Sequence, residues 1–94
     1  MPVTLFIPTA LRGFTERNAE LSLEAATVGE LISALTQKYP DLRTHLLDEK
    51  GELRPFVNVF VGEINIQSRG GFAFPLKDGD VVTLIPAIAG GARG

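Results

Sequence analysis

The stretch KDGDVVTLIPAIAGG, residues 77–91, contains a turn, a strand and a glycine-rich end in direct succession. Residues 77–80, KDGD, have the composition of a tight turn. Val81–Ile85 is a short apolar and β-branched run, which is typical of a buried strand. Pro86 follows, and the small residues after it lead to Gly90–Gly91. The stretch therefore predicts a last strand that ends in a narrow tail.

Four segments upstream of this turn have the composition of strands. Val3–Ile7 is β-rich and lies between two prolines, and residues 19–25, AELSLEA, alternate at two leucines, so the two segments are expected to pair as a hairpin. Phe56–Val61 is largely apolar on both faces, as expected for a strand near the centre of a sheet or one that contacts a partner. Residues 62–67, GEINIQ, suit a short edge strand.

Residues 27–40, TVGELISALTQKYP, give the clearest helical pattern. Thr27 is a natural N-cap, and Glu30 follows three residues later, so the two are expected to form a capping box. Pro40 ends the helix because the residue before a proline avoids helical geometry. A short helical turn over residues 42–47 is expected to close the core. The helix presents one apolar stripe: Val28, Leu31, Ile32, Leu35 and Tyr39. One helix on a mixed sheet of four to five strands is an α+β fold.

The composition suits one small domain and excludes several classes of function. Ninety-four residues, 45% of them hydrophobic, can build one core but not two independent units. A net charge of −2 with scattered Lys and Arg gives no basic face for nucleic acid or anionic lipid. The absence of cysteine excludes disulfides and thiol nucleophiles. No run approaches the roughly 18 apolar residues of a membrane span, so a cytoplasmic protein is expected. The single histidine, His45, is expected to lie at the surface.

The order of elements, with KDGD before the last strand and a diglycine after it, resembles the β-grasp fold of ubiquitin. It resembles the bacterial sulfur carriers of the MoaD/ThiS family more closely, through VTLFIPTALR (3–12), FVNVFVGE (56–63) and residues 77–91. Within the family, these motifs are most similar to those of carriers that work with an alternative cysteine synthase. The resemblance implies a β-grasp domain over residues 1–86 and a flexible tail over residues 87–94.

The resemblance also implies a carrier rather than an enzyme. An E1-like enzyme would adenylate its C-terminal glycine with ATP and convert it to a thiocarboxylate, which would donate sulfur to a cysteine synthase-like acceptor. The carrier itself would bind no cofactor and no metal. Three alternatives stay open: a molybdopterin synthase small subunit (acting with the large subunit) or thiamine-pathway carrier, a ubiquitin-like modifier joined to lysines, and a binding module whose tail has no role.

The tail is narrow enough for an active-site channel because glycine has no Cβ. The five residue steps from Pro86 to Gly91 reach about 17 Å when extended. Gly91 is followed by Ala92-Arg93-Gly94, so its carbonyl is part of an amide and cannot react with ATP. Cleavage between Gly91 and Ala92 by a JAMM-type metallopeptidase is therefore expected, with Gly94 as the alternative working terminus. The tail residues before the reacting Gly91 are Pro86, Ala87, Ile88, Ala89 and Gly90.

The aromatic residues divide between core and surface. Four phenylalanines in the second half of the chain are more than one helix can cover, so some of them are expected to be exposed. Together with apolar residues of the last strand and tail, they would form a patch that docks on the partners. The expected docking residues are Phe56, Phe60, Phe74, Ile85 and Ile88.

Overall fold

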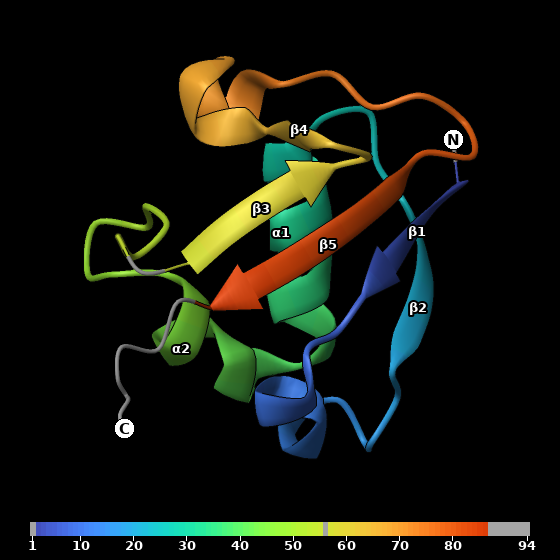
Figure 1. Cartoon of the computed structure of the whole chain (residues 1–94). Coiled ribbons are helices and arrows are strands. Elements are labelled where there is room, and N and C mark those ends of the chain that lie inside the picture. Colours follow the sequence, from blue (N-terminus) through green and yellow to red (C-terminus); the bar gives the residue numbers. More distant parts are fainter. Residues whose placement is uncertain (1, 56, 87–94) are drawn as a thin grey trace.

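A computed structural model describes residues 2–55 and 57–86 of the chain. A five-stranded sheet forms one layer, and the main helix lies across one of its faces (Figure 1). The strands and helices are β1 (Pro2–Phe6), β2 (Glu20–Glu24), α1 (Val28–Lys38), α2 (Arg43–Leu46), β3 (Val57–Val61), β4 (Ile64–Asn65) and β5 (Val81–Pro86), with short 3₁₀ segments between them. This order confirms the predicted α+β class.

The sheet has the strand order β2-β1-β5-β3-β4, which places β5 at its centre. β1 and β5 run parallel, with Phe6 opposite Thr83, and all the other pairs are antiparallel. Because parallel strands end at the same edge of a sheet, the chain leaves β1 after Phe6 and β5 after Pro86 at the same end of the molecule. The predicted functional tail follows Pro86 in the sequence, so this end of the molecule is the one relevant to function.

The start of α1 is held by two hydrogen bonds between side chains and backbone amides. The Thr27 hydroxyl accepts from the Glu30 amide at 3.2 Å, as predicted for an N-cap. The Glu30 carboxylate accepts from the amide of Ala26 at 3.0 Å, one residue earlier than in the expected reciprocal pair. The helix ends at Lys38, before Pro40, as the sequence predicts.

The core lies between the sheet and α1. The whole apolar stripe of the helix is buried, and so are Leu42, Leu46 and Leu47, which confirms that the short helical turn after Pro40 closes the core. The sheet contributes its inward side chains to the same cluster: Val3, Leu5, Val57, Val59, Val61, Val82 and Leu84. The described residues therefore form one domain around a single continuous core.

Several strand boundaries differ from the sequence-based expectations. The first strand is Pro2–Phe6 instead of Val3–Ile7, and the loop that follows contains a 3₁₀ helix, Thr9–Phe14. The edge strand shrinks to Ile64–Asn65 because Ile66 turns into the core, where it is fully buried. The KDGD turn forms as predicted, with the Asp80 carboxylate accepting from the Lys77 amide at 2.8 Å.

The proposed division between domain and tail falls at the limit of the described residues. Residues 87–94 lie outside the described residues, and so does Phe56. Within the described part of the chain, no helix is long and apolar enough to cross a membrane.

Candidate functional site

The two faces of β5 differ in exposure although both are largely apolar. Val82 and Leu84 point into the core and are 0% and 1% exposed. Val81 and Ile85 point to the other side and are 40% and 45% exposed. Because side chains alternate along a strand, this difference identifies one covered face of the sheet and one open face.

Strand pairing brings further apolar side chains to the open face. Thr83 pairs with Phe6 on β1 and with Phe60 on β3, so the three residues form a row across the middle of the sheet. Val81 and Ile85 lie two residues away from Thr83 in each direction along β5. We call this set, Phe6, Phe60, Val81, Thr83 and Ile85, the outer-face patch.

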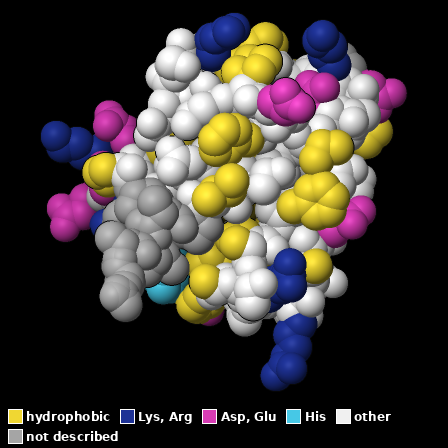
Figure 2. Space-filling model, in the orientation of Figure 1, with side chains coloured by type: hydrophobic (Ala, Val, Ile, Leu, Met, Phe, Trp, Pro, Cys, Tyr) yellow, Lys and Arg dark blue, Asp and Glu magenta, His cyan; other side chains and the backbone are white. Residues whose placement is uncertain are grey.

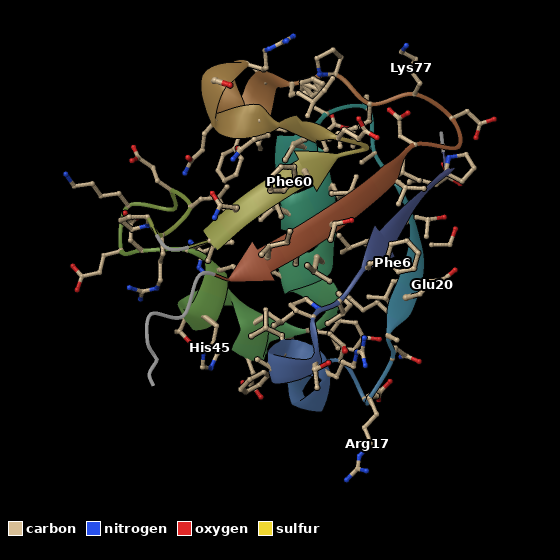
Figure 3. The ribbon with its side chains drawn as sticks, viewed as in Figure 1. Phe6, Arg17, Glu20, His45, Phe60 and Lys77 are labelled. Atoms are coloured by element: carbon tan, nitrogen blue, oxygen red, sulfur yellow. The ribbon has the colours of Figure 1, made fainter. Side chains whose placement is uncertain are left out.

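Hydrophobic side chains gather over this face in the space-filling view (Figure 2). Phe6, on β1, and Phe60, on β3, lie on opposite sides of β5 (Figure 3). Phe6 is 40% exposed, and Phe60 is half-buried. The ends of the row are polar, because Phe6 pairs with Glu20 and Phe60 with Asn65. An apolar centre with a polar rim is the usual composition of a protein-binding surface.

The outer-face patch reaches the point where the described chain ends. Ile85 is next to Pro86, which pairs with Val57 as the last residue of β5. The strand that carries the middle of the patch is therefore the strand that leads into residues 87–94.

The structure brings together only part of the predicted docking set. Phe60 and Ile85 share the open face, as predicted. Phe74 does not belong with them: it packs against the core, and its carbonyl accepts from the amide of Val28 at 3.0 Å. The segment before β5 crosses the start of α1, which explains this position. Phe56 and Ile88 lie outside the described residues, as do the predicted reacting glycine, Gly91, and the predicted cleavage site after it.

Three members of the patch, Phe6, Val81 and Thr83, were not predicted. All three follow from alternation alone, since Thr83 lies between the inward Val82 and Leu84. Leu5 and Ile7 are inward, so Phe6 between them must point outward, and Val81 must oppose Val82 in the same way. Phe6 lies outside the aromatic-rich second half of the chain, on which the predicted docking set was based.

The described residues contain no arrangement typical of catalysis. No group of three or more His, Cys, Asp or Glu among them could hold a metal ion. His45 is exposed, as predicted, and its ring lies 4.3 Å from that of Phe14, measured between centroids. Asp48 has a pKa below its ordinary value because the backbone amides of Glu52 and Lys50 donate to its carboxylate, which marks a turn.

A helix-backed mixed sheet, open on one face and leading into a diglycine tail, defines a small ubiquitin-like carrier or modifier. Comparison with known proteins gives the family. The model of the ThiS family matches residues 5–91, and the chain belongs to that family.

Individual relatives agree with this assignment. The sulfur carrier protein CysO of Mycobacterium tuberculosis is 40% identical over 93 residues, covering 97% of this chain and 100% of the relative. A chain in the crystal structure of the Amycolatopsis orientalis BexX/CysO complex matches with a TM-score of 0.87 and 34% identity, covering 98% of this chain and 99% of that one. These matches confirm the predicted β-grasp fold and the predicted class, a carrier rather than an enzyme.

A third relative comes from an archaeon. The small archaeal modifier protein 3 of Haloferax volcanii is 38% identical over 66 residues, covering 70% of this chain and 71% of the relative.

Proposed function

We propose that this sulfur carrier works through a thiocarboxylate on Gly91, formed after Ala92–Gly94 are removed, and that it donates sulfur in cysteine biosynthesis. The observation that carries the proposal is the continuity of the outer-face patch with the strand that leads to the tail. A partner docked on Phe60 and Ile85 would contact the strand that leads directly into the tail. The similarity to carriers named CysO supports the choice of pathway.

The proposed chemistry takes place at one carbonyl group. An oxygen of the Gly91 carboxylate attacks the α-phosphorus of ATP, and pyrophosphate leaves. A sulfur nucleophile then attacks the acyl carbon of the adenylate, and AMP leaves, so that a thiocarboxylate remains. The carrier supplies neither ATP nor a metal to these steps, and it needs no cysteine because the sulfur is held on its own terminus.

Three kinds of partner follow from this chemistry. An E1-like enzyme adenylates the carrier and directs sulfur to it, and a JAMM-type metallopeptidase first exposes Gly91. A cysteine synthase-like enzyme accepts the sulfur. The relative crystallised as a complex with BexX supports the inference that carriers of this kind function bound to a second protein. Because ATP and the sulfur acceptor are cytoplasmic, we propose that the protein acts in the cytoplasm.

The test uses carrier that ends at Gly91. Incubated with the E1-like enzyme of its host, ATP and sulfide, this protein should gain about 16 Da, the difference between oxygen and sulfur. Carrier that ends at Gly94 is the matched control and should keep its mass until the peptidase is added. A gain of mass on the Gly94 form without loss of Ala92–Gly94 would contradict the precursor model.

A second candidate function is protein modification, which the archaeal modifier relative favours. It requires the same tail and the same adenylation, but the activated Gly91 would be transferred to lysine side chains of other proteins. Immunoblots of host lysate distinguish the two, because a modifier produces conjugates of higher mass. Loss of growth without added cysteine in a strain that lacks the gene supports the first function. Loss of molybdenum-enzyme activity instead would point to a molybdopterin synthase small subunit.

A further inference from the structure

The turn Thr15–Asn18, between β1 and β2, has an unusual backbone. Glu16 and Arg17 have φ angles of 56° and 67°, and they are the two residues other than glycine with positive φ in the part of the chain that the structure describes. Left-handed backbone is unfavourable for residues with a long side chain. Two such residues in succession at the centre of a turn are typical of type I′, in which Asn-Gly is the preferred pair.

Several hydrogen bonds fix this strained turn. The Asn18 amide donates to the Thr15 carbonyl at 2.9 Å, which closes it, and the Arg17 amide donates to the carbonyl of Arg12 at 2.7 Å. The hydroxyl of Thr15, which is fully buried, donates to the Asn18 carbonyl at 3.0 Å. The Asn18 side chain reaches the hydroxyl of Tyr39 at 3.4 Å. The surroundings therefore hold the backbone of Arg17 in one position.

The side chain of Arg17, in contrast, is held by nothing in the described chain. This side chain is exposed, and it makes no hydrogen bond or ion pair with any residue that the structure describes. It points away from the body of the molecule (Figure 3). Because β1 and β5 are parallel, the turn that follows β1 lies at the end of the molecule where β5 ends at Pro86. A fixed backbone thus presents a free guanidinium at the tail end.

Resting on the proposed function, we propose that Arg17 is a second contact with the activating enzyme and binds a carboxylate of an acidic surface beside the channel that takes the tail. Strained backbone persists where the surrounding structure enforces it, and such strain gathers at functional sites. An Asn-Gly pair would make the same turn at lower cost but would present no charge. Arginine suits the role because its planar guanidinium binds a carboxylate through two hydrogen bonds.

The charged residues next to Arg17 do not share this role. Arg12 is engaged within the chain, since its Nε donates to the Ile7 carbonyl at 3.0 Å and its carbonyl accepts from the turn. Glu16 has the opposite charge and shares the strained backbone, so it provides a matched control at the neighbouring position. Arg17 would contribute to orientation: the outer-face patch fixes which face docks, and Arg17 fixes how the tail end is turned toward the channel.

The experiment compares four carriers ending at Gly91: wild type, Glu16→Asn, Arg17→Lys and the double variant Glu16→Asn/Arg17→Gly. Binding to the E1-like enzyme is measured by titration calorimetry, and thiocarboxylate formation by mass. The double variant should melt about 4 °C or more higher than wild type, because the preferred turn pair replaces a strained one. Its dissociation constant and its half-saturating concentration should nevertheless rise about fivefold or more, with the rate at saturation unchanged.

The control variants separate the effect of the Arg17 charge from the effect of the strained backbone. Glu16→Asn should bind like wild type, and Arg17→Lys should lose part of the affinity because an ammonium cannot pair in the bidentate geometry. The loss in the double variant should shrink at high salt. A double variant that is more stable and binds as wild type does would overturn the role of Arg17, and so would an equal loss in Glu16→Asn. Wild type that binds but forms no thiocarboxylate would contradict the proposed function alone, while wild type that does not bind would overturn both.

Discussion

The two faces of β5 have similar composition and opposite surroundings. Leu84 on the inner face is covered by α1, whereas Ile85, the next residue, is 45% exposed. Both are aliphatic residues of nearly equal size, so hydrophobicity does not distinguish a core residue from an interface residue. Their alternation along the strand distinguishes them, because only one face of this sheet has a helix on it in the described chain.

The difference in exposure between the two faces of β5 also separates the residues that stabilise the domain from those that bind partners. On the inner face, apolar area is removed from water when the chain folds, at about 25 cal/mol per Å². On the outer face, much of the apolar area stays in contact with water after folding. The free energy of burying it is gained only when another protein covers Phe6, Phe60 and Ile85. The inner face should therefore determine whether the domain folds, and the outer face whether the folded domain is recognised.

The strongest test of this comparison is a pair of neighbouring substitutions. Leu84→Ala should lower the free energy of unfolding by about 2–5 kcal/mol, because it removes buried methyl groups and leaves a cavity. Ile85→Ala should lower it by less than about 1 kcal/mol. Urea denaturation followed by circular dichroism measures both. Equal losses at the two positions would mean that the outer face is covered within the folded chain, and the comparison would fail.

A second test concerns function on the outer face. Phe60→Ser removes one of the two aromatic rings of the patch and should raise the half-saturating concentration of carrier for the E1-like enzyme about tenfold, as expected for an aromatic anchor. The free energy of unfolding should change much less in this variant than in Leu84→Ala. Phe74→Leu is the matched control, since Phe74 packs against the core, and it should affect stability more than activation. The reverse pattern would return Phe74 to the docking surface and remove Phe60 from it.

Local patterns predicted the regular elements of the fold well. The helix α1 has its own start and stop signals, Thr27 and Pro40, and the strands have clear composition. The position of Phe74 could not be predicted in this way, because residues 66–76 contain short 3₁₀ segments with no strand alternation. Their path across α1 depends on long-range contacts, such as the amide of Leu76 donating to the Ala26 carbonyl at 2.8 Å. Phe6, by contrast, was available from alternation in the first strand.

A third test addresses the helix that makes one face the inner one. Thr27→Ala removes the hydroxyl that accepts from the Glu30 amide, so it should lower the free energy of unfolding by about 1 kcal/mol. Thr27→Ser keeps an N-cap hydroxyl and should recover most of the loss. Thermal unfolding measures both variants. Activation by the E1-like enzyme at saturation should be unchanged in each, because the cap lies on the helix side of the sheet. A selective loss of activation would show that the helix face also contacts the enzyme.

The smallest expected effect lies in a turn that belongs to neither face. Asp48 accepts from the amides of Lys50 at 2.8 Å and Glu52 at 3.1 Å, and its pKa in the folded protein is below its ordinary value. A lowered pKa means that the folded state favours the ionised carboxylate, so the stabilisation is present above the ordinary pKa and is lost as the pH falls through the folded one. Asp48→Asn should therefore destabilise the protein slightly at neutral pH and not at all at about pH 2.

The size of this effect is limited because the carboxylate lies at the protein surface, where solvent screens its charge. Glu49→Gln is the matched control, since it removes a charge from the same turn but leaves both amides bonded to Asp48. Comparing the unfolding free energies of the three proteins across this pH range isolates the contribution of the Asp48 charge. A cost of Asp48→Asn that stays constant down to pH 2 would mean that the turn is held by the shape of the side chain. In that case the electrostatic account of this region is wrong, while the contrast between the faces of β5 is unaffected.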